Sequence, residues 1–152
     1  MPGRTRKLLL ELYGAAVEAA HPRACLPPHL PRVPASGRLA VLCAGKAAAD
    51  MGAAVEQHYS ASGDLNRISG LVTAPHGYAA TLGPSAIKCL EIVEGRHPTP
   101  DEASQRAAEA ALAFARSTGT DDVLLVLLSG GASALWAAPV RGLSLAEKTA
   151  LT

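Results

Sequence analysis

Two glycine-containing turns carry the residues best suited to bind a negatively charged group. They are Ala44-Gly45-Lys46-Ala47 and Ser129-Gly130-Gly131-Ala132-Ser133. Each follows an apolar run and precedes a helical pattern, so unpaired backbone N–H groups and a positive helix end point out of the turn together. Glycine lets the main chain approach a phosphate or carboxylate, hydroxyls of Ser129 and Ser133 can donate, and Lys46 can supply charge. We predict an anion site; a simple tight turn and a solvated lysine are the structural alternatives.

Several sharper motifs are absent. A P-loop requires a first glycine and a hydroxyl after the lysine, and the turn at Gly45-Lys46 has neither. A Gly-x-Gly-x-x-Gly dinucleotide loop does not occur. The stretch Gly131-Ala132-Ser133-Ala134 resembles a loosened nucleophile elbow, but no histidine follows Ser133 in the chain. An acyl-transfer enzyme that uses Ser133 or Ser129 is therefore the least favoured interpretation.

The remaining reactive side chains give weaker signals. His97 and Asp101 lie in or near a strand-to-helix connection and can line a site. A loop histidine is more often merely exposed, and this alternative applies to His97 and equally to His76. The five histidines form no metal-ligand cluster, so the metal ligands remain unknown. The three cysteines are far apart and we expect them to be reduced, with Cys43 and Cys89 buried as small apolar residues.

The elements that position these turns are predicted from hydrophobic periodicity. Strands are expected at residues 39–43, 68–75, 86–95 and 123–128, the third near a sheet edge because of Lys88 and Glu91, and the last buried on both faces. A helix is expected from the first glycine turn to about Tyr59.

Two further helices are expected, one before the first strand and one between the third and fourth strands. One covers residues 4–20, and its apolar face holds Leu8, Leu12, Ala15, Ala16 and Ala19. The other begins with a capping box of Thr99 and Glu102 around Pro100, and its buried stripe holds Ala103, Ala107, Ala110, Ala111 and Phe114.

Strands that alternate with helices predict a Rossmann-like α/β fold: an open, mostly parallel sheet with helices on both faces. We divide the chain into residues 1–37, a helix and a proline-rich irregular connection, and residues 38–152, the α/β domain. Ser144 and Glu147 form a capping box for a last helix that stops after about two turns. The sequence is therefore expected to be truncated within this domain, with a second domain absent.

Composition limits the partners. The chain has 14 basic and 13 acidic residues among 152, so no strong field favours nucleic acid or an acidic membrane. No apolar stretch approaches the roughly 18 residues of a membrane span, and the N-terminus lacks a full signal-peptide core. We expect a small-molecule ligand and a cytoplasmic location.

Four segments together resemble a known family. CAGKAAADMGAAVE, EGRHPTPDEASQRAAEAAL, DDVLLVLLSGGASALWAAP and GLSLAEKTALT are similar, in order and spacing, to the N-terminal portion of the two-domain glycerate 2-kinases. The resemblance implies a Rossmann-like domain followed by a second α/β domain, with the active site between them. It also implies phosphorylation of glycerate with ATP and a divalent metal, here Mg²⁺.

The resemblance assigns roles by position. Lys46, next to Gly45, would be the catalytic or phosphate-neutralising lysine, and Ser129 to Ser133 would be part of the substrate or phosphate loop. Ala132 stands where the family usually has a third glycine. An essential arginine and the metal ligands would lie beyond residue 152, so the chain alone is expected to be inactive. A non-catalytic sugar-phosphate or nucleotide binding module is the alternative, and a homodimer is left open.

Overall fold

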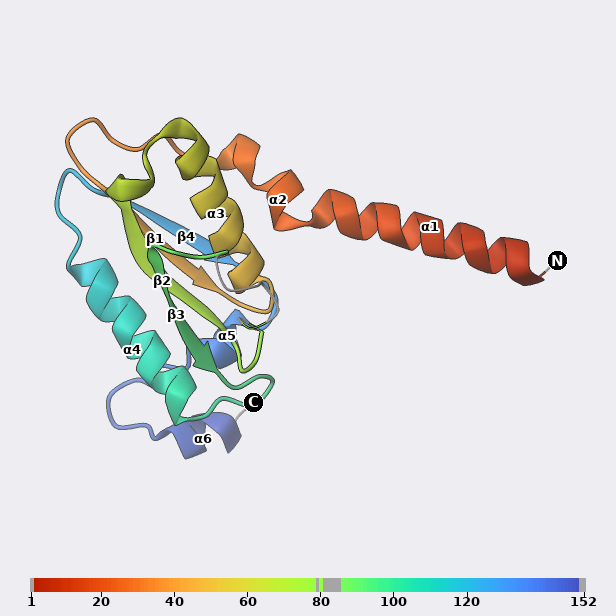
Figure 1. The fold of residues 1–152 in the computed structure, drawn as a ribbon. Coiled ribbons are helices and arrows are strands. Elements are labelled where there is room, and N and C mark those ends of the chain that lie inside the picture. The colour runs from red at the N-terminus through yellow and green to blue at the C-terminus, as the bar shows by residue number, and fades with distance from the viewer. Residues whose placement is uncertain (1, 79, 81–85, 151–152) are drawn as a thin grey trace.

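A four-stranded parallel sheet forms the centre of the computed structural model, which describes residues 2–78, 80 and 86–150. The strands are β1 (Leu39–Ala44), β2 (Ile68–Pro75), β3 (Leu90–Gly95) and β4 (Val123–Leu128), in the order β3-β2-β1-β4. Helix α3 (Ala48–Ser62) covers one face and helix α4 (Glu102–Arg116) covers the other (Figure 1). The predicted Rossmann-like α/β fold is confirmed.

Strand β1 is the most buried element because it lies between β2 and β4. All six of its residues are buried, and Leu39 pairs with Ile68 on one side and Val123 on the other. Residues Leu39, Val41 and Cys43 pack under α3, as a continuous apolar run in a parallel sheet predicts. Burial raises the pKa of the Cys43 thiol to about 12, so this cysteine is a small apolar core residue, as predicted.

Helix α4 begins later than the sequence indicated. Asp101, and not Thr99, is the N-cap: its carboxylate accepts from the Ser104 amide at 2.9 Å, and Ser104 closes the capping box. The buried stripe is therefore Ser104, Ala107, Ala108 and Ala111, whereas the predicted Ala110 is exposed and Ala103 and Phe114 are half-buried. A buried Ser104 is tolerated because its hydroxyl has hydrogen-bond partners.

The N-terminal segment contains helices α1 (Pro2–Ala20) and α2 (Pro22–Cys25) and a 3₁₀ turn, η1 (Pro27–His29). The irregular connection predicted for residues 22–37 is therefore wrong in its first part, which holds α2 and η1, and is confirmed only for the residues that follow His29. This later part is held against the domain by the Tyr59 hydroxyl, which donates to the Pro31 carbonyl at 2.5 Å, and by Arg67, which donates to the carbonyls of Pro34 and Gly37. The division at residue 37 stays a prediction.

The remaining short elements are η2 (Leu65–Arg67), α5 (Ala132–Leu135) and α6 (Leu145–Ala150). The capping box of α6 is present, because the Ser144 amide donates to Glu147 at 2.7 Å and the Glu147 amide donates to the Ser144 hydroxyl at 3.2 Å. Within the described residues, no helix has both the length and the apolar character needed to cross a membrane.

Two predictions about exposure are wrong, those for β4 and for Cys89. Strand β4 is an edge strand with one open face, so Leu124, Val126 and Leu128 are 40%, 44% and 62% exposed. Strand β3 is the other edge, as predicted, but it begins at Leu90; Cys89 precedes it and is exposed. The apolar face of α1 is exposed along its whole length.

Candidate anion-binding site

The two predicted glycine turns lie against each other at the carboxyl edge of the sheet. They follow β1 and β4, which are neighbouring parallel strands. The Ser129 amide donates to the Ala44 carbonyl, and the Lys46 amide donates to the Gly130 carbonyl, both at 2.9 Å. The Ala47 amide donates to the Ser129 hydroxyl at 3.0 Å. The structure therefore brings Gly45, Lys46 and the turn from Ser129 to Ser133 together.

Gly45 is required by this close approach. Its φ is +125°, a conformation that favours glycine, and a Cβ there would lie 2.6 Å from the Ser129 carbonyl oxygen. A side chain at this position would push the two turns apart.

Lys46 and His97 meet at the second glycine turn. A Cβ on Gly131, whose φ is +95°, would lie 2.7 Å from His97 Cδ2 and 3.5 Å from Lys46 Cγ. A Cβ on Gly130 would lie 3.8 Å from Lys46 Cε. The lysine side chain therefore runs along both glycines, and the His97 ring, contributed by the connection after β3, lies against the second. Among the described residues, Lys46 is exposed and has no carboxylate partner.

Backbone amides supply the donors of this site. The amides of Ser129, Ala132 and Ala134 bond to carbonyl oxygens, whereas those of Gly130, Gly131 and Ser133 find no acceptor in the part of the chain that the structure describes. Gly130 and Ser133 are also exposed, and Ala132 is half-buried. Helix α5 has only four residues, so the expected contribution of a helix dipole is wrong here; free amides and the Lys46 charge remain.

The two serines of the turn differ in their surroundings. Ser129 is half-buried, and its hydroxyl satisfies the Ala47 amide at the entrance to α3, which has no local side-chain cap. Ser133 is exposed, and within the described residues its hydroxyl makes no hydrogen bond. Ser129 therefore joins the two turns, and Ser133 is free to donate to a ligand.

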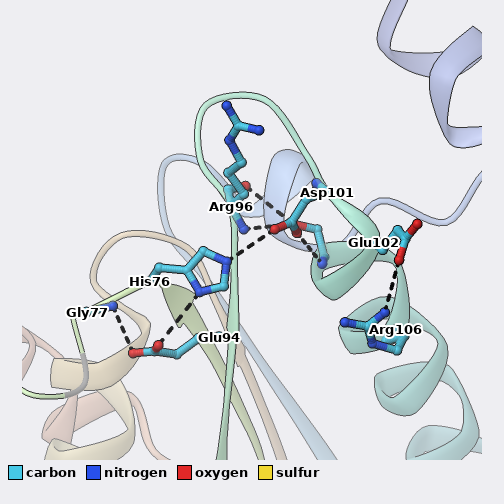
Figure 2. A network of polar contacts seen from close by, with 8 residues as sticks. His76, Gly77, Glu94, Arg96, Asp101, Glu102 and Arg106 are labelled. Carbon is cyan, nitrogen blue, oxygen red and sulfur yellow. Dashed lines mark hydrogen bonds and ion pairs between the residues drawn. The ribbon is translucent and has the colours of Figure 1, made fainter.

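A second polar cluster, around His76, was given little weight in the sequence. His76 lies between two carboxylates (Figure 2): its Nε2 is 3.2 Å from Asp101 Oδ2, and its Nδ1 is 3.7 Å from Glu94 Oε2. The cluster joins the ends of β2 and β3 to the start of α4. Asp101 is thus a capping and pairing residue, and its position three residues before Ser104 was the sequence signal for this role.

Hydrogen bonding controls the charge of Asp101. Desolvation acts to raise its pKa, but hydrogen bonds from the Ser104 amide, from His76 and from the Ser104 hydroxyl outweigh it and lower the pKa to about 2. The Ser104 hydroxyl also accepts from the Arg96 amide at 2.9 Å. The His76 cluster therefore fixes the loop that carries His97, the ring that lies against Gly131.

No metal centre is formed by the residues that the structure describes: no three His, Cys, Asp or Glu side chains among them are grouped to hold an ion. The geometry instead offers an ammonium, free amides, a free hydroxyl and an imidazole on one edge. Such a donor set can bind a phosphate or a carboxylate.

Together these features define a Rossmann-like α/β domain with a candidate anion site at the carboxyl edge of its sheet. Residues 8–152 match a family described as "Domain of unknown function (DUF4147)". The chain therefore belongs to the DUF4147 family, and the resemblance to the N-terminal domain of glycerate kinases is confirmed by its relatives.

Two relatives and one solved structure are similar to the chain over nearly its whole length. The chain is 38% identical over 146 residues to an Agrobacterium vitis protein named "Putative hydroxypyruvate reductase", covering 96% of this chain and 31% of that protein. It is 33% identical over 151 residues to D-glycerate 2-kinase of Thermotoga maritima, covering 99% of this chain and 34% of that protein. The crystal structure of glycerate kinase from that organism superposes with a TM-score of 0.76 at 31% identity, over 99% of this chain and 34% of that one. The chain spans about a third of the length of these relatives.

Proposed function

We propose that this chain is the N-terminal part of an ATP-dependent kinase that phosphorylates glycerate, with 2-phosphoglycerate as the product. One observation supports the proposal: Lys46 lies along the turn that carries the free amides of Gly130, Gly131 and Ser133, at one edge of the sheet. The likeness to proteins named glycerate kinase supports the choice of reaction.

Phosphoryl transfer suits these residues. Its loose transition state requires mainly alignment of the reactants and neutralisation of charge on the equatorial oxygens. Lys46 would supply the charge, the amides of the glycine turn would donate hydrogen bonds, and the Ser133 hydroxyl and His97 ring would orient the bound anion. ATP would supply the transferred phosphoryl group, and the donor set fits either its phosphates or the glycerate carboxylate.

Magnesium is also part of this proposal, although the described residues do not provide a set of ligands for it. We expect its ligands beyond residue 152, and no step is assigned here to the metal. The residues of this chain hold and orient the anion.

The proposal is tested on a longer protein that contains these residues and extends to the length of the relatives. ATP, magnesium and glycerate are supplied, and ADP formation is followed by a coupled assay. Lys46→Met is expected to lower kcat by about 10²-fold or more, as for other preorganised electrostatic groups. Lys88→Met is the matched control, because Lys88 is exposed and precedes β3 at the opposite edge of the sheet. A loss of less than a few-fold for Lys46→Met would remove this lysine from the mechanism.

The same preparation distinguishes the other functions. Hydroxypyruvate and NADH or NADPH are supplied in parallel, because a relative is named as a reductase. Oxidation of the nicotinamide without ADP formation would show that the protein is a reductase and not a kinase. The sequence argues against this outcome, because it lacks a Gly-x-Gly-x-x-Gly dinucleotide loop. Binding of ATP or a sugar phosphate without either reaction would indicate a binding module. Residues 1–152 alone are expected to show no turnover, because they span only about a third of the length of the relatives.

Two finer features belong to the proposal. A cytoplasmic location is supported by the three free cysteines, which suit a reducing compartment. A homodimer is the second, and the surface that would form it is derived below.

A further inference from the structure

Among the residues that the structure describes, helix α1 has no packing partner that accounts for its apolar side chains. It extends away from the rest of the molecule (Figure 1), and residues 3–20 are all exposed. Leu8, Leu9 and Leu12 are 54%, 60% and 59% exposed. Helices of this length draw most of their stability from packing of an apolar face, so a partner for this face is expected.

The apolar face of α1 has an ordered distribution of side-chain sizes. Spacings of three and four residues place seven positions on one stripe, which we call the α1 seam: Thr5, Leu8, Leu9, Leu12, Ala15, Ala16 and Ala19. The leucines occupy the N-terminal half of the α1 seam up to its centre, and the alanines occupy the C-terminal half.

This distribution is complementary to itself when two copies run antiparallel. With a two-fold axis at Leu12, Leu8 and Leu9 of one copy lie opposite Ala15 and Ala16 of the other, so large side chains meet small ones as in a well-packed core. A parallel pair would place leucine on leucine and leave a gap along the alanines.

Charge favours the same arrangement. Arg4 lies beside the α1 seam near its N-terminal end, and Glu18 lies on the same side near the other end. Lys7 and Glu11, also on this side, already pair within one helix at 3.8 Å. Antiparallel pairing brings Arg4 of one copy towards Glu18 of the second copy. Glu18 already binds Arg23 at 2.6 Å, so a further cation would extend an existing ion pair. Antiparallel helix dipoles also attract.

We propose that α1 is a homodimerisation helix, whose seam pairs antiparallel with the α1 seam of a second copy of this chain around a two-fold axis at Leu12. A two-fold interface requires one patch to be complementary to itself, and the α1 seam meets this requirement in the sizes of its side chains. The proposal is independent of the kinase activity.

The first test measures the mass of the 152-residue chain by sedimentation over a range of concentrations. We expect a dimer, and Leu12→Glu should weaken association by about 100-fold or more because it places two carboxylates at the axis. Leu10→Glu is the matched control: Leu10 is 59% exposed and lies on the side of α1 opposite the seam, so the same change should leave the dimer intact. Both variants should have the Tm of the unsubstituted α/β domain, because both substituted side chains are exposed on α1.

The second test determines the orientation by cross-linking, after the two exposed cysteines, Cys25 and Cys89, are replaced by serine. Copies with Leu8→Cys and copies with Ala15→Cys should form a disulfide only when mixed. In the antiparallel pair the two Leu8 positions are about 12 Å apart along the axis, too far to be bridged. A disulfide between two Leu8→Cys copies would overturn the antiparallel arrangement. A chain that is monomeric at every concentration would overturn the proposal, and the α1 seam would then be available to the additional chain that longer relatives contain.

Discussion

Replacing Gly131 by alanine perturbs the candidate site at the point where the glycine turn, Lys46 and His97 meet. Two separate effects are expected. The φ of +95° is unfavourable for alanine, and the new Cβ would lie 2.7 Å from His97 Cδ2 and 2.8 Å from His97 Nε2. Because the nearest atoms belong to the far end of a side chain, the ring can turn away, and the main consequence is displacement of His97 from the turn.

The size of each effect can be worked out. The left-handed backbone costs a residue with a Cβ about 1 to 2 kcal/mol. Forcing His97 away from its rotamer costs a further 0.5 to 1.5 kcal/mol, roughly. Gly131→Ala should therefore lower the free energy of unfolding by about 1.5 to 3.5 kcal/mol, and each kcal/mol lowers Tm by about 2 to 4 °C in a chain of this size.

Gly142→Ala is the matched control. Gly142 has a φ of +94°, almost the same as Gly131, but a Cβ there meets no atom within 4 Å. Gly142→Ala should therefore lower the free energy of unfolding through the backbone conformation alone, without displacing the His97 ring. The difference in unfolding free energy between the two variants then measures the contribution of the His97 contact.

The assay combines thermal unfolding with a titration of inorganic phosphate or ATP, followed through the amide and His97 resonances by NMR. We expect Gly131→Ala to weaken anion binding by about 10-fold, which corresponds to the loss of one charge-assisted hydrogen bond. Gly142→Ala should leave binding unchanged. Equal stability and equal binding for the two variants would refute the inference that the Gly131 turn and His97 form one site.

Three further predictions concern groups that hold this edge and the core together. Ser129→Ala should lower the free energy of unfolding by about 1 kcal/mol because the Ala47 amide loses its acceptor, whereas Ser133→Ala should leave Tm unchanged and weaken only anion binding. The pKa of Asp101 is lowered from 3.8 to about 2 in the folded state, so its stabilising contribution is complete above pH 4 and is lost as the pH falls from about 4 to 2. When urea unfolding is measured across this pH range, the free energy of unfolding should change less with pH for Asp101→Asn than for the unsubstituted protein. Glu56→Gln should destabilise the protein by about 2 kcal/mol in chemical denaturation, because the buried carboxylate accepts from the amides of residues 88, 89 and 90 at 2.7 to 2.8 Å and an amide group cannot accept all three; an unchanged midpoint would refute this role.

Buried parallel strands were the most predictable part of the fold. The run at residues 68–75 matches β2 at both ends, and β1 extends the predicted strand by one residue. A continuous apolar run bounded by glycine or proline leaves few alternatives. The run at residues 123–128 has the same composition, yet β4 has one open face, because a sequence pattern shows what a strand can bury and not whether a neighbour covers it.

The start of α4 shows how a contact distant in sequence decides between two local signals. Thr99 and Glu102 form one capping pattern, and Asp101 and Ser104 form another two residues later. Asp101 is the N-cap of α4, and its carboxylate also pairs with His76 from the end of β2. Helix-capping preferences depend on neighbouring residues in the sequence, so they cannot predict this contact.

The meeting of the two glycine turns was predictable, whereas the place of His97 was not. Loops that follow neighbouring parallel strands emerge at the same edge, so Lys46 and the Ser129 turn were expected to be close. His97 follows β3, which lies two strands away from β1, and it reaches Gly131 only because the chain after β4 turns back beneath β2 and β3. That return is set by packing of α5 and by the Trp136 ring nitrogen, which donates to Thr73 at 2.9 Å.

The hydrogen bonds of the serines favour anion binding over acyl transfer at this edge. A nucleophilic serine needs a base within hydrogen-bond reach, and no serine hydroxyl in the described part of the chain bonds to a histidine. Ser129 instead accepts from the Ala47 amide, and Ser104 accepts from the Arg96 amide, so each hydroxyl fixes a loop that leads to the site. Rigid loops keep free amides at fixed positions, which is the requirement for stabilising charge on a transferred phosphoryl group.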